Sequence, residues 1–295
     1  MARLRGSELI QSLLGVIDEP FSWRKKIGLP MIYGILLVYY EEYYNVSILE
    51  FKKLLDCIDS NNCLIVVTNN PALVADVNGY LLGEDSQSEF SGYDAGLKSI
   101  KKFSSNDYVI FGNDTFCHHR HWSGFERRIF AKSIKNFVAQ KNEGIVGEVD
   151  SFGQEFNLLD VKGSSWISTY LFCLSPNLLI SLNKKIFLKK NVTTQLIYAD
   201  SNNTLMWGSR ISKNIIVQLT SWVSEKNKHG WYNKHSSIDS KVIKLRSILN
   251  EFYLSAYAES KGYKLINVYS GLNVFSLTRL KFRRIIRYLR LQLGL

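Results

Sequence analysis

The stretch DYVIFGNDTFCHHRHW, residues 107–122, carries a run of apolar residues directly into side chains that could do chemistry. Asp114, with Asn113 and Thr115 beside it, offers a carboxylate oxygen of the kind that Mg²⁺ and Mn²⁺ prefer. An aspartate at this position also has an ordinary interpretation, in which it only caps the following turn. Asp114 is therefore a candidate metal ligand, provided that the apolar run before it ends at a cleft.

A cysteine, three histidines and an arginine follow within residues 117–121. Imidazole and thiolate are zinc ligands, which raises the question of a zinc site. Cys117, His118, His119 and His121 lie too close together in sequence to surround one tetrahedral ion, and no second pair of ligands is evident. Two interpretations remain open: Arg120 and one of the histidines face a ligand, or the cluster is ordinary surface.

Four apolar runs alternate with helical patterns in the first half of the chain. They cover residues 34–40, 63–70, 79–85 and 107–114, and the third is the weakest. The other three are almost continuously apolar, which is typical of strands covered on both faces. The alternation predicts an α/β fold with a mostly parallel sheet covered by helices.

Helix starts are predicted from two pairs with capping-box spacing, Ser47 with Glu50 and Ser91 with Asp94. Apolar residues at helical spacing follow the first pair, which predicts an amphipathic helix. These residues are Phe51, Leu54, Leu55 and Ile58.

Polar residues or a tyrosine end every one of the four apolar runs. Ligands of such sheets bind beyond the carboxyl ends of the strands, so these ends predict a shared cleft. The ends are Tyr40-Glu41, Asn69-Asn70, Glu84-Asp85 and Asn113-Asp114.

Charge and composition limit the classes of function. The 295 residues carry a formal net charge of +11, but eight basic residues and no acid follow Glu259, which leaves 29 bases against 26 acids in residues 1–259. This distribution argues against a broad nucleic-acid interface on the body. The longest apolar run, residues 29–40, is too short to span a bilayer, and the four cysteines show no metal spacing. We therefore expect a cytoplasmic protein with reduced thiols.

The second half contains fewer clear patterns. Residues 164–175 predict a strand or buried segment, residues 240–262 a long helix, and residues 263–270 a short strand. Between them, residues 224–240 form a polar stretch with an embedded Trp231-Tyr232 pair, which we interpret as a loop. An aromatic lid and a disordered surface loop are equally compatible with it.

The C-terminal tail has the pattern of a basic amphipathic helix. Four arginines lie opposite its apolar stripe. This pattern suits the anionic cytoplasmic face of a membrane. Docking on the protein's own body or on a partner remains an alternative. The stripe consists of Phe282, Ile285, Ile286, Leu289 and Leu293, and the arginines are Arg279, Arg283, Arg287 and Arg290.

A set of motifs in a fixed order resembles a known family. The motifs are YYEE (39–42), VVTNN (66–70), SEFSGYDAGL (88–97), FGNDTF (111–116) and NEFYLSAYAESKGYKLINV (250–268). In this order they resemble the bacterial GT-A-fold, family-2-like inverting glycosyltransferases. The similarity is greatest to rhamnan-synthesis and O-antigen galactofuranosyl- or rhamnosyltransferases, and it spans residues 33–270.

The resemblance implies roles for individual residues. Glu251 takes the position of the catalytic base, and Asp114 that of the ligand of Mg²⁺ or Mn²⁺. One certain carboxylate stands where the family has two, so metal independence stays open. Arg120 and a histidine would face the donor diphosphate or the acceptor. The nucleotide-sugar site would comprise Tyr40, Asn69, Asn70, Asp94, Asn113, Asp114 and Arg120, and the acceptor and lid side His119, His121, Trp231 and Tyr232.

These implications give a specific hypothesis. Residues 1–270 form a GT-A-like (Rossmann-type) domain with an N-terminal extension (1–30), and residues 271–295 form the basic helix. The protein transfers a sugar from a nucleotide-sugar donor to a lipid-linked or growing surface polysaccharide, such as O-antigen or capsule. We expect it in the cytoplasm, peripheral on the inner face of the cell membrane, and not bound to nucleic acid. The alternatives are a non-catalytic nucleic-acid- or membrane-binding protein and a nucleotidyltransferase on a similar sheet.

Overall fold

The computed structural model describes residues 30–74, 81–83, 88–223 and 236–278, together with residues 280 and 282. Several predictions therefore lie outside the described residues. They concern the N-terminal extension up to residue 29, the strand end at Glu84 and Asp85, the pair Trp231 and Tyr232, and most of the C-terminal helix.

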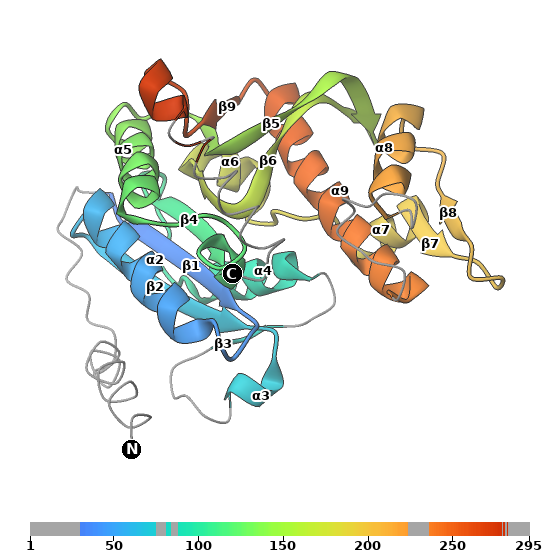
Figure 1. Ribbon diagram of the computed structural model, residues 1–295, viewed down its shortest axis with the longest axis horizontal. Helices are drawn as coiled ribbons and strands as arrows, with labels where there is room; N and C mark the ends of the chain where they lie inside the picture. Colours follow the sequence, from blue (N-terminus) through green and yellow to red (C-terminus); the bar gives the residue numbers. More distant parts are fainter. Residues whose placement is uncertain are drawn as a thin grey trace.

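A seven-stranded sheet forms the centre of the molecule, with the strand order β3-β2-β1-β4-β6-β5-β9 (Figure 1). Only β6 runs against the others, because it pairs antiparallel with both β4 and β5, whereas every other pairing is parallel. This confirms the predicted fold class, an α/β, GT-A-like (Rossmann-type) sheet that is mostly parallel. The strands are β1 Ile32–Val38, β2 Asn62–Thr68, β3 Leu81–Leu82, β4 Tyr108–Asn113, β5 Gly144–Leu158, β6 Val161–Leu174 and β9 Lys264–Asn267.

Helices cover both faces of this sheet. On one face, α2 (Tyr44–Ile58) packs against β1, and α5 (Gly124–Ala139) packs against α2 and β5, with Phe51 and Ile134 in the shared core. On the other face lie α4 (Glu89–Ser99), α6 (Pro176–Ser181) and the C-terminal part of α9 (Ile238–Ser260). Successive side chains of β1 point to opposite faces, so Leu36 lies in the first core and Leu37 in the second. Both faces are therefore buried, as the continuous apolar runs predicted.

A third core lies beyond the edge of this sheet. The distal part of the β5–β6 hairpin packs there against α8 (Lys213–Val223) and another face of α9, around Phe156, Trp166 and Phe252. A two-stranded sheet completes this region (Figure 1). The remaining elements are α3 Pro71–Val74, the 3-10 helix η1 Asp114–Phe116, α7 Lys190–Leu196, β7 Ile197–Ala199 and β8 Leu205–Trp207.

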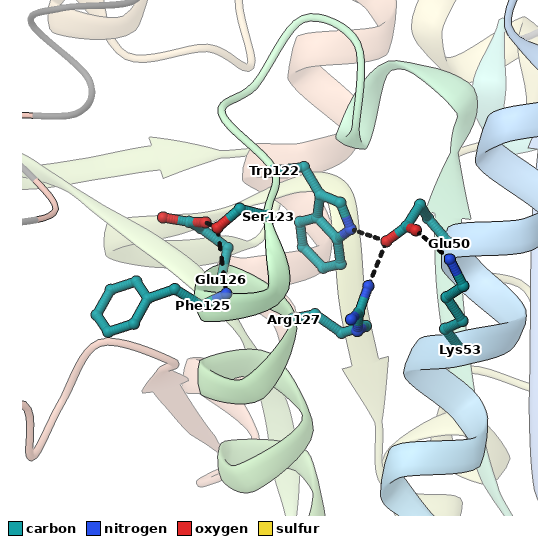
Figure 2. Close-up of polar contacts among 7 residues, drawn as sticks. All are labelled: Glu50, Lys53, Trp122, Ser123, Phe125, Glu126 and Arg127. Atoms are coloured by element: carbon teal, nitrogen blue, oxygen red, sulfur yellow. Dashed lines mark hydrogen bonds and ion pairs between the residues drawn. The ribbon is translucent and has the colours of Figure 1, made fainter.

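Both predicted capping boxes are wrong. Helix α2 begins at Tyr44, so Ser47 lies inside it and donates its hydroxyl to the carbonyl of Tyr43 at 2.9 Å. Glu50 instead accepts hydrogen bonds from Trp122 Nε1 at 3.1 Å and Arg127 Nη1 at 2.5 Å, which ties α2 to the start of α5 (Figure 2).

The second box fails in the same way. Helix α4 begins at Glu89, so Ser91 and Asp94 lie within the helix. The Ser91 hydroxyl donates to the carbonyl of Ser88 at 2.8 Å, and Asp94 forms an ion pair with Lys98 at 2.6 Å. The predicted helices themselves are confirmed, but each begins three or four residues earlier than its box indicated, after Tyr43 and Ser88.

Residues 164–175, predicted as a strand or buried segment, form most of β6. The long helix predicted at residues 240–262 is confirmed as α9, and the short strand that follows it is confirmed as β9. Strand β5 was not predicted. Within the described ranges, no helix is both long and apolar enough to cross a membrane.

Candidate active site

A cavity of about 620 Å³ opens at the carboxyl ends of β1, β2 and β4, and α9 and β6 form its opposite side. Polar side chains from these distant segments converge on it. Seven of the predicted site residues line this cavity: Tyr40, Asn69, Asn113, Asp114, His119, Arg120 and Glu251. Asp114 and Glu251 were expected at one crevice together with Asn70; both line this cavity, whereas Asn70 does not, and the roles of all these residues stay predictions.

Asp114 is buried where β4 ends and η1 begins. Its Oδ2 accepts hydrogen bonds from the backbone N–H groups of Tyr39 at 2.7 Å and Tyr40 at 2.9 Å. Burial raises the pKa of the Asp114 carboxyl above its usual value, although these two hydrogen bonds and the nearby His118 and His119 act to lower it. The carboxylate thus fixes the end of β1 and also borders the cavity.

The neighbours of Asp114 add little to a metal site. Asn113 Oδ1 accepts a hydrogen bond from the Thr115 hydroxyl. Among the described residues there is no group of three or more histidine, cysteine, aspartate or glutamate side chains that could hold an ion. Mg²⁺ in phosphate-transfer sites is commonly held by one or two carboxylates, substrate phosphate oxygens and water. The residues present fit only an ion of this kind, which Asp114 would hold and which would neutralise charge on a diphosphate.

The two asparagines after β2 have different positions. Asn69 is buried, and its Nδ2 donates to the carbonyl of Ser88 at 2.8 Å. Its Oδ1 is buried without a hydrogen-bond partner in the described part of the chain. Asn70 does not line the cavity, because its Nδ2 donates to the carbonyl of Tyr39 and its Oδ1 accepts from the N–H of Ala72, both at 3.1 Å. Of these two asparagines, Asn69 is therefore the one that lines the cavity.

Asp94, predicted for the nucleotide-sugar site, is not among the residues that line the cavity. Its carboxylate is occupied by Lys98 on the next turn of α4.

Some residues of the cluster 117–121 line the cavity, and others contact the surrounding structure. His119 and Arg120 line the cavity. The Arg120 guanidinium lies 4.5 Å from the centre of the Tyr170 ring and 3.8 Å from Glu148 Oε2. His118 stacks on Tyr43 with ring centres 4.0 Å apart.

His121, predicted on the acceptor side, does not line the cavity. Its Nε2 lies 3.8 Å from Glu126 Oε2, at the start of α5. Arg120 and His119 are thus the two members of the cluster that can meet a ligand in the cavity.

Glu251 approaches the cavity from α9, half-buried beside Phe252. Its Oε1 accepts hydrogen bonds from the Thr169 hydroxyl and from the Thr169 backbone N–H, the latter at 3.3 Å. Burial raises the pKa of Glu251 from 4.5 to about 7, and the negative charge of Glu89 contributes, while Lys244 and Thr169 act to lower it. A carboxylate with this pKa has the proton affinity that a general base needs at neutral pH.

Sequence reasoning missed three charged residues of this cavity, Asp150, Glu89 and Lys244. Lys244 Nζ lies 4.0 Å from Glu89 Oε1, which links α9 to the first turn of α4. Although burial acts to raise it, Lys244 and the Ser88 hydroxyl hold the pKa of Glu89 below its usual value. The spacing of Lys244 and Glu251, seven residues apart on one helix, was the available signal, since such residues share a face.

The cavity also has a less polar side. Trp166, Trp222 and Ile248 line it, and the two indole rings lie 6.2 Å apart. Asp150 and Ser168 stand beside this wall, with the Ser168 hydroxyl donating to Asp150 Oδ2 at 2.7 Å. The cavity therefore combines charged groups on one side with aromatic surface on the other, as in sites for small polar ligands.

Comparison with known proteins adds little. No family model matches the sequence, and no curated protein matches it. One similar solved structure is a mannosyltransferase from Pyrobaculum calidifontis in complex with GDP-Man and Mn²⁺. It is 13% identical in sequence, with a TM-score of 0.34, and the match covers 98% of this chain and 89% of that one. A similarity this weak carries no argument about function.

Proposed function

We propose that this protein is a glycosyltransferase that moves a sugar from a nucleotide-sugar donor to a hydroxyl group of an acceptor. One observation carries the proposal: a single cavity holds the strand-end residues Asn69 and Asp114 and, opposite them, a glutamate whose pKa is about 7. Crevices at the carboxyl ends of strands are the usual ligand sites of such sheets. The ordered motifs that resemble GT-A-fold enzymes support the same conclusion.

The proposed reaction is a single inverting displacement. Glu251 removes the proton from the acceptor hydroxyl, whose oxygen forms a bond to the anomeric carbon of the donor sugar. The bond from that carbon to the diphosphate oxygen breaks, so the nucleoside diphosphate leaves with the bonding electrons and the proton remains on Glu251. Base catalysis of this kind contributes about 10²–10⁴-fold.

The donor would lie against the strand ends. Arg120, which lines the cavity near Asp114, would compensate charge on the diphosphate. Tyr40, Asn69 and Asn113 would contact the nucleoside. Asn70 and Asp94 lie away from the cavity wall, so we assign them to the support of the site and not to direct donor contact.

The acceptor that we propose is a lipid-linked or growing surface glycan, such as O-antigen or capsule. Such an acceptor fits the resemblance and the basic C-terminal tail. That tail would hold the enzyme on the cytoplasmic face of the membrane, where such acceptors are elongated. The rhamnosyl- or galactofuranosyltransferase assignment rests on the motifs alone.

A thermal-shift panel of UDP-, dTDP- and GDP-sugars, with and without Mn²⁺, tests the proposal. One nucleotide class should raise the melting temperature, since a ligand at 100 times its Kd adds about 2.7 kcal/mol of stability. The same donor should then be consumed in a transfer assay with membrane glycolipid as acceptor. If no donor binds, and oligonucleotides bind with a steep salt dependence, the non-catalytic alternative is correct.

A further inference from the structure

Helix α5 presents a basic stripe to solvent on the side of the molecule where β9 ends. Arg128, Lys132 and Lys135 are exposed and lie at i, i+4 and i+7, within about 60° of arc at 3.6 residues per turn. We call these three residues the α5 basic stripe. The only acid of α5, Glu126, is buried, so the stripe has no acidic neighbour on its own helix.

The adjacent base of α5 has a different environment, which sets the stripe apart. Arg127 turns toward α2, where Glu50 neutralises it at 2.5 Å (Figure 2). Within the described part of the chain, no ion pair engages Arg128, Lys132 or Lys135.

A groove of about 320 Å³ joins this stripe to the segment that follows β9. Arg128 and Lys132 form one side of the groove, and Ser270 and Leu272 form the other. The chain then enters a helical turn at residues 274–278, which lies beside α5 (Figure 1).

Large apolar side chains project into solvent from this last segment. Val274 is 80% exposed, Phe275 77% and Phe282 62%, whereas Leu280 between them is buried. Val274, Phe275 and Phe282 fall at i, i+1 and i+8, which places them on one face of a helix. Exposed aromatic and aliphatic side chains beside uncompensated bases form the pattern of an interfacial membrane anchor.

We propose that the α5 basic stripe and the exposed face of Val274, Phe275 and Phe282 form one surface that docks on an anionic lipid membrane. The lysines and arginine would contact lipid headgroups, and the apolar side chains would enter the boundary of the acyl chains. A nucleic acid would use the bases but would leave the apolar face in water. Eight further bases and no acid follow Glu259, so the charge of this end matches an anionic surface.

Vesicle flotation of the full-length protein tests the proposal independently of any transfer activity. The probes are vesicles of phosphatidylcholine with and without 30% phosphatidylglycerol. The stripe variant R128E/K132E/K135E should bind the anionic vesicles at least tenfold more weakly than the wild type, because each base contributes near the surface. The matched control K185E/K189E/K190E has the same change in net charge at exposed lysines of another surface and should retain most of the binding.

The apolar part has its own pair of variants. V274S/F275S should weaken binding to anionic vesicles at least fivefold, whereas V217S, at an exposed valine of α8, should not. The proposal is overturned if the stripe variant binds like the wild type. It is also overturned if the lysine control loses as much binding as the stripe variant, because the attraction would then be diffuse. If the wild type binds oligonucleotides but not vesicles, and the stripe variant loses this binding, the surface would be assigned to nucleic acid instead.

Discussion

Replacing Glu251 with glutamine should separate catalysis from donor binding. The amide keeps the shape of the side chain and an oxygen that can accept the hydrogen bonds from Thr169. It cannot take a proton from an acceptor hydroxyl, so the transfer rate should fall by about 10²–10⁴-fold. Donor binding should be unchanged, because Glu251 lies on the side of the cavity opposite Asp114.

The same substitution should stabilise the protein at high pH. The rise in the pKa of Glu251 from 4.5 to about 7 corresponds to about 3 kcal/mol of free energy. Below pH 4.5 the carboxyl is protonated in both the folded and the unfolded chain, so its contribution to stability is fully present. Between pH 4.5 and 7 the unfolded chain releases the proton first, and this contribution is lost. Above pH 7 the folded wild type therefore bears the full cost of a buried charge.

Urea unfolding of wild type and E251Q at pH 4 and pH 8 measures this cost. The two proteins should have similar unfolding free energies at pH 4, and the variant should be more stable by up to about 3 kcal/mol at pH 8. The variant E42Q, at an exposed glutamate, serves as the control and should show no such difference.

The pH dependence of transfer provides the second measurement. The kcat/KM of the wild type should rise about tenfold per pH unit below neutrality and level off above a midpoint near 7. A variant E251Q that retains near-normal turnover, or a flat profile between pH 5.5 and 8, would refute the assignment of Glu251 as the base.

Two further pairs of variants test the charges around Glu251 and Asp114. D114N keeps an acceptor for the backbone N–H groups and should unfold within about 1 kcal/mol of wild type yet lose transfer, whereas D114A should also lose about 1–3 kcal/mol of unfolding free energy in urea titrations. If D114N kept full activity, the negative charge of Asp114 would have no role in the mechanism. K244M should move the acid limb of the kcat/KM profile to higher pH and E89Q to lower pH, because these charges respectively lower and raise the pKa of Glu251. Shifts in the same direction would contradict this electrostatic account.

The parallel sheet could be predicted because its strands are buried on both faces. Residues 34–40, 63–70 and 107–114 are almost continuously apolar, and in a chain of alternating strands and helices this pattern is typical of strands with a helix layer on each side. Strand β5 escaped prediction because Glu148, Asp150 and Glu155 interrupt its apolar pattern, and two register shifts against β6 break its alternation.

The helix starts failed for a local reason. A serine followed three residues later by an acid also occurs inside helices, where the hydroxyl can bond back to a carbonyl one turn earlier. Ser47 and Ser91 both do this, with the carbonyls of Tyr43 and Ser88. Spacing alone cannot distinguish this arrangement from a cap.

The site could be predicted only where a strand end or a motif marked a residue. Asp114 follows a buried strand and Glu251 falls in a segment that resembles a family motif, whereas Glu89 carries no local pattern and Lys244 only its seven-residue spacing from Glu251. They come together because α4 and α9 cover the same face of the sheet, a property of tertiary packing.

The electrostatics of Glu89 and Glu251 show how one cavity can hold two carboxylates with different tasks. Lys244 lies next to Glu89 and holds its pKa low, so Glu89 stays ionised at neutral pH. That fixed negative charge, together with burial, raises the pKa of Glu251 to about 7. Environments that separate the pKa values of neighbouring acids are typical of acid–base assignments in enzymes. Lys244 therefore has two effects: its own charge lowers the pKa of Glu251, and it also keeps ionised the Glu89 carboxylate that raises this pKa.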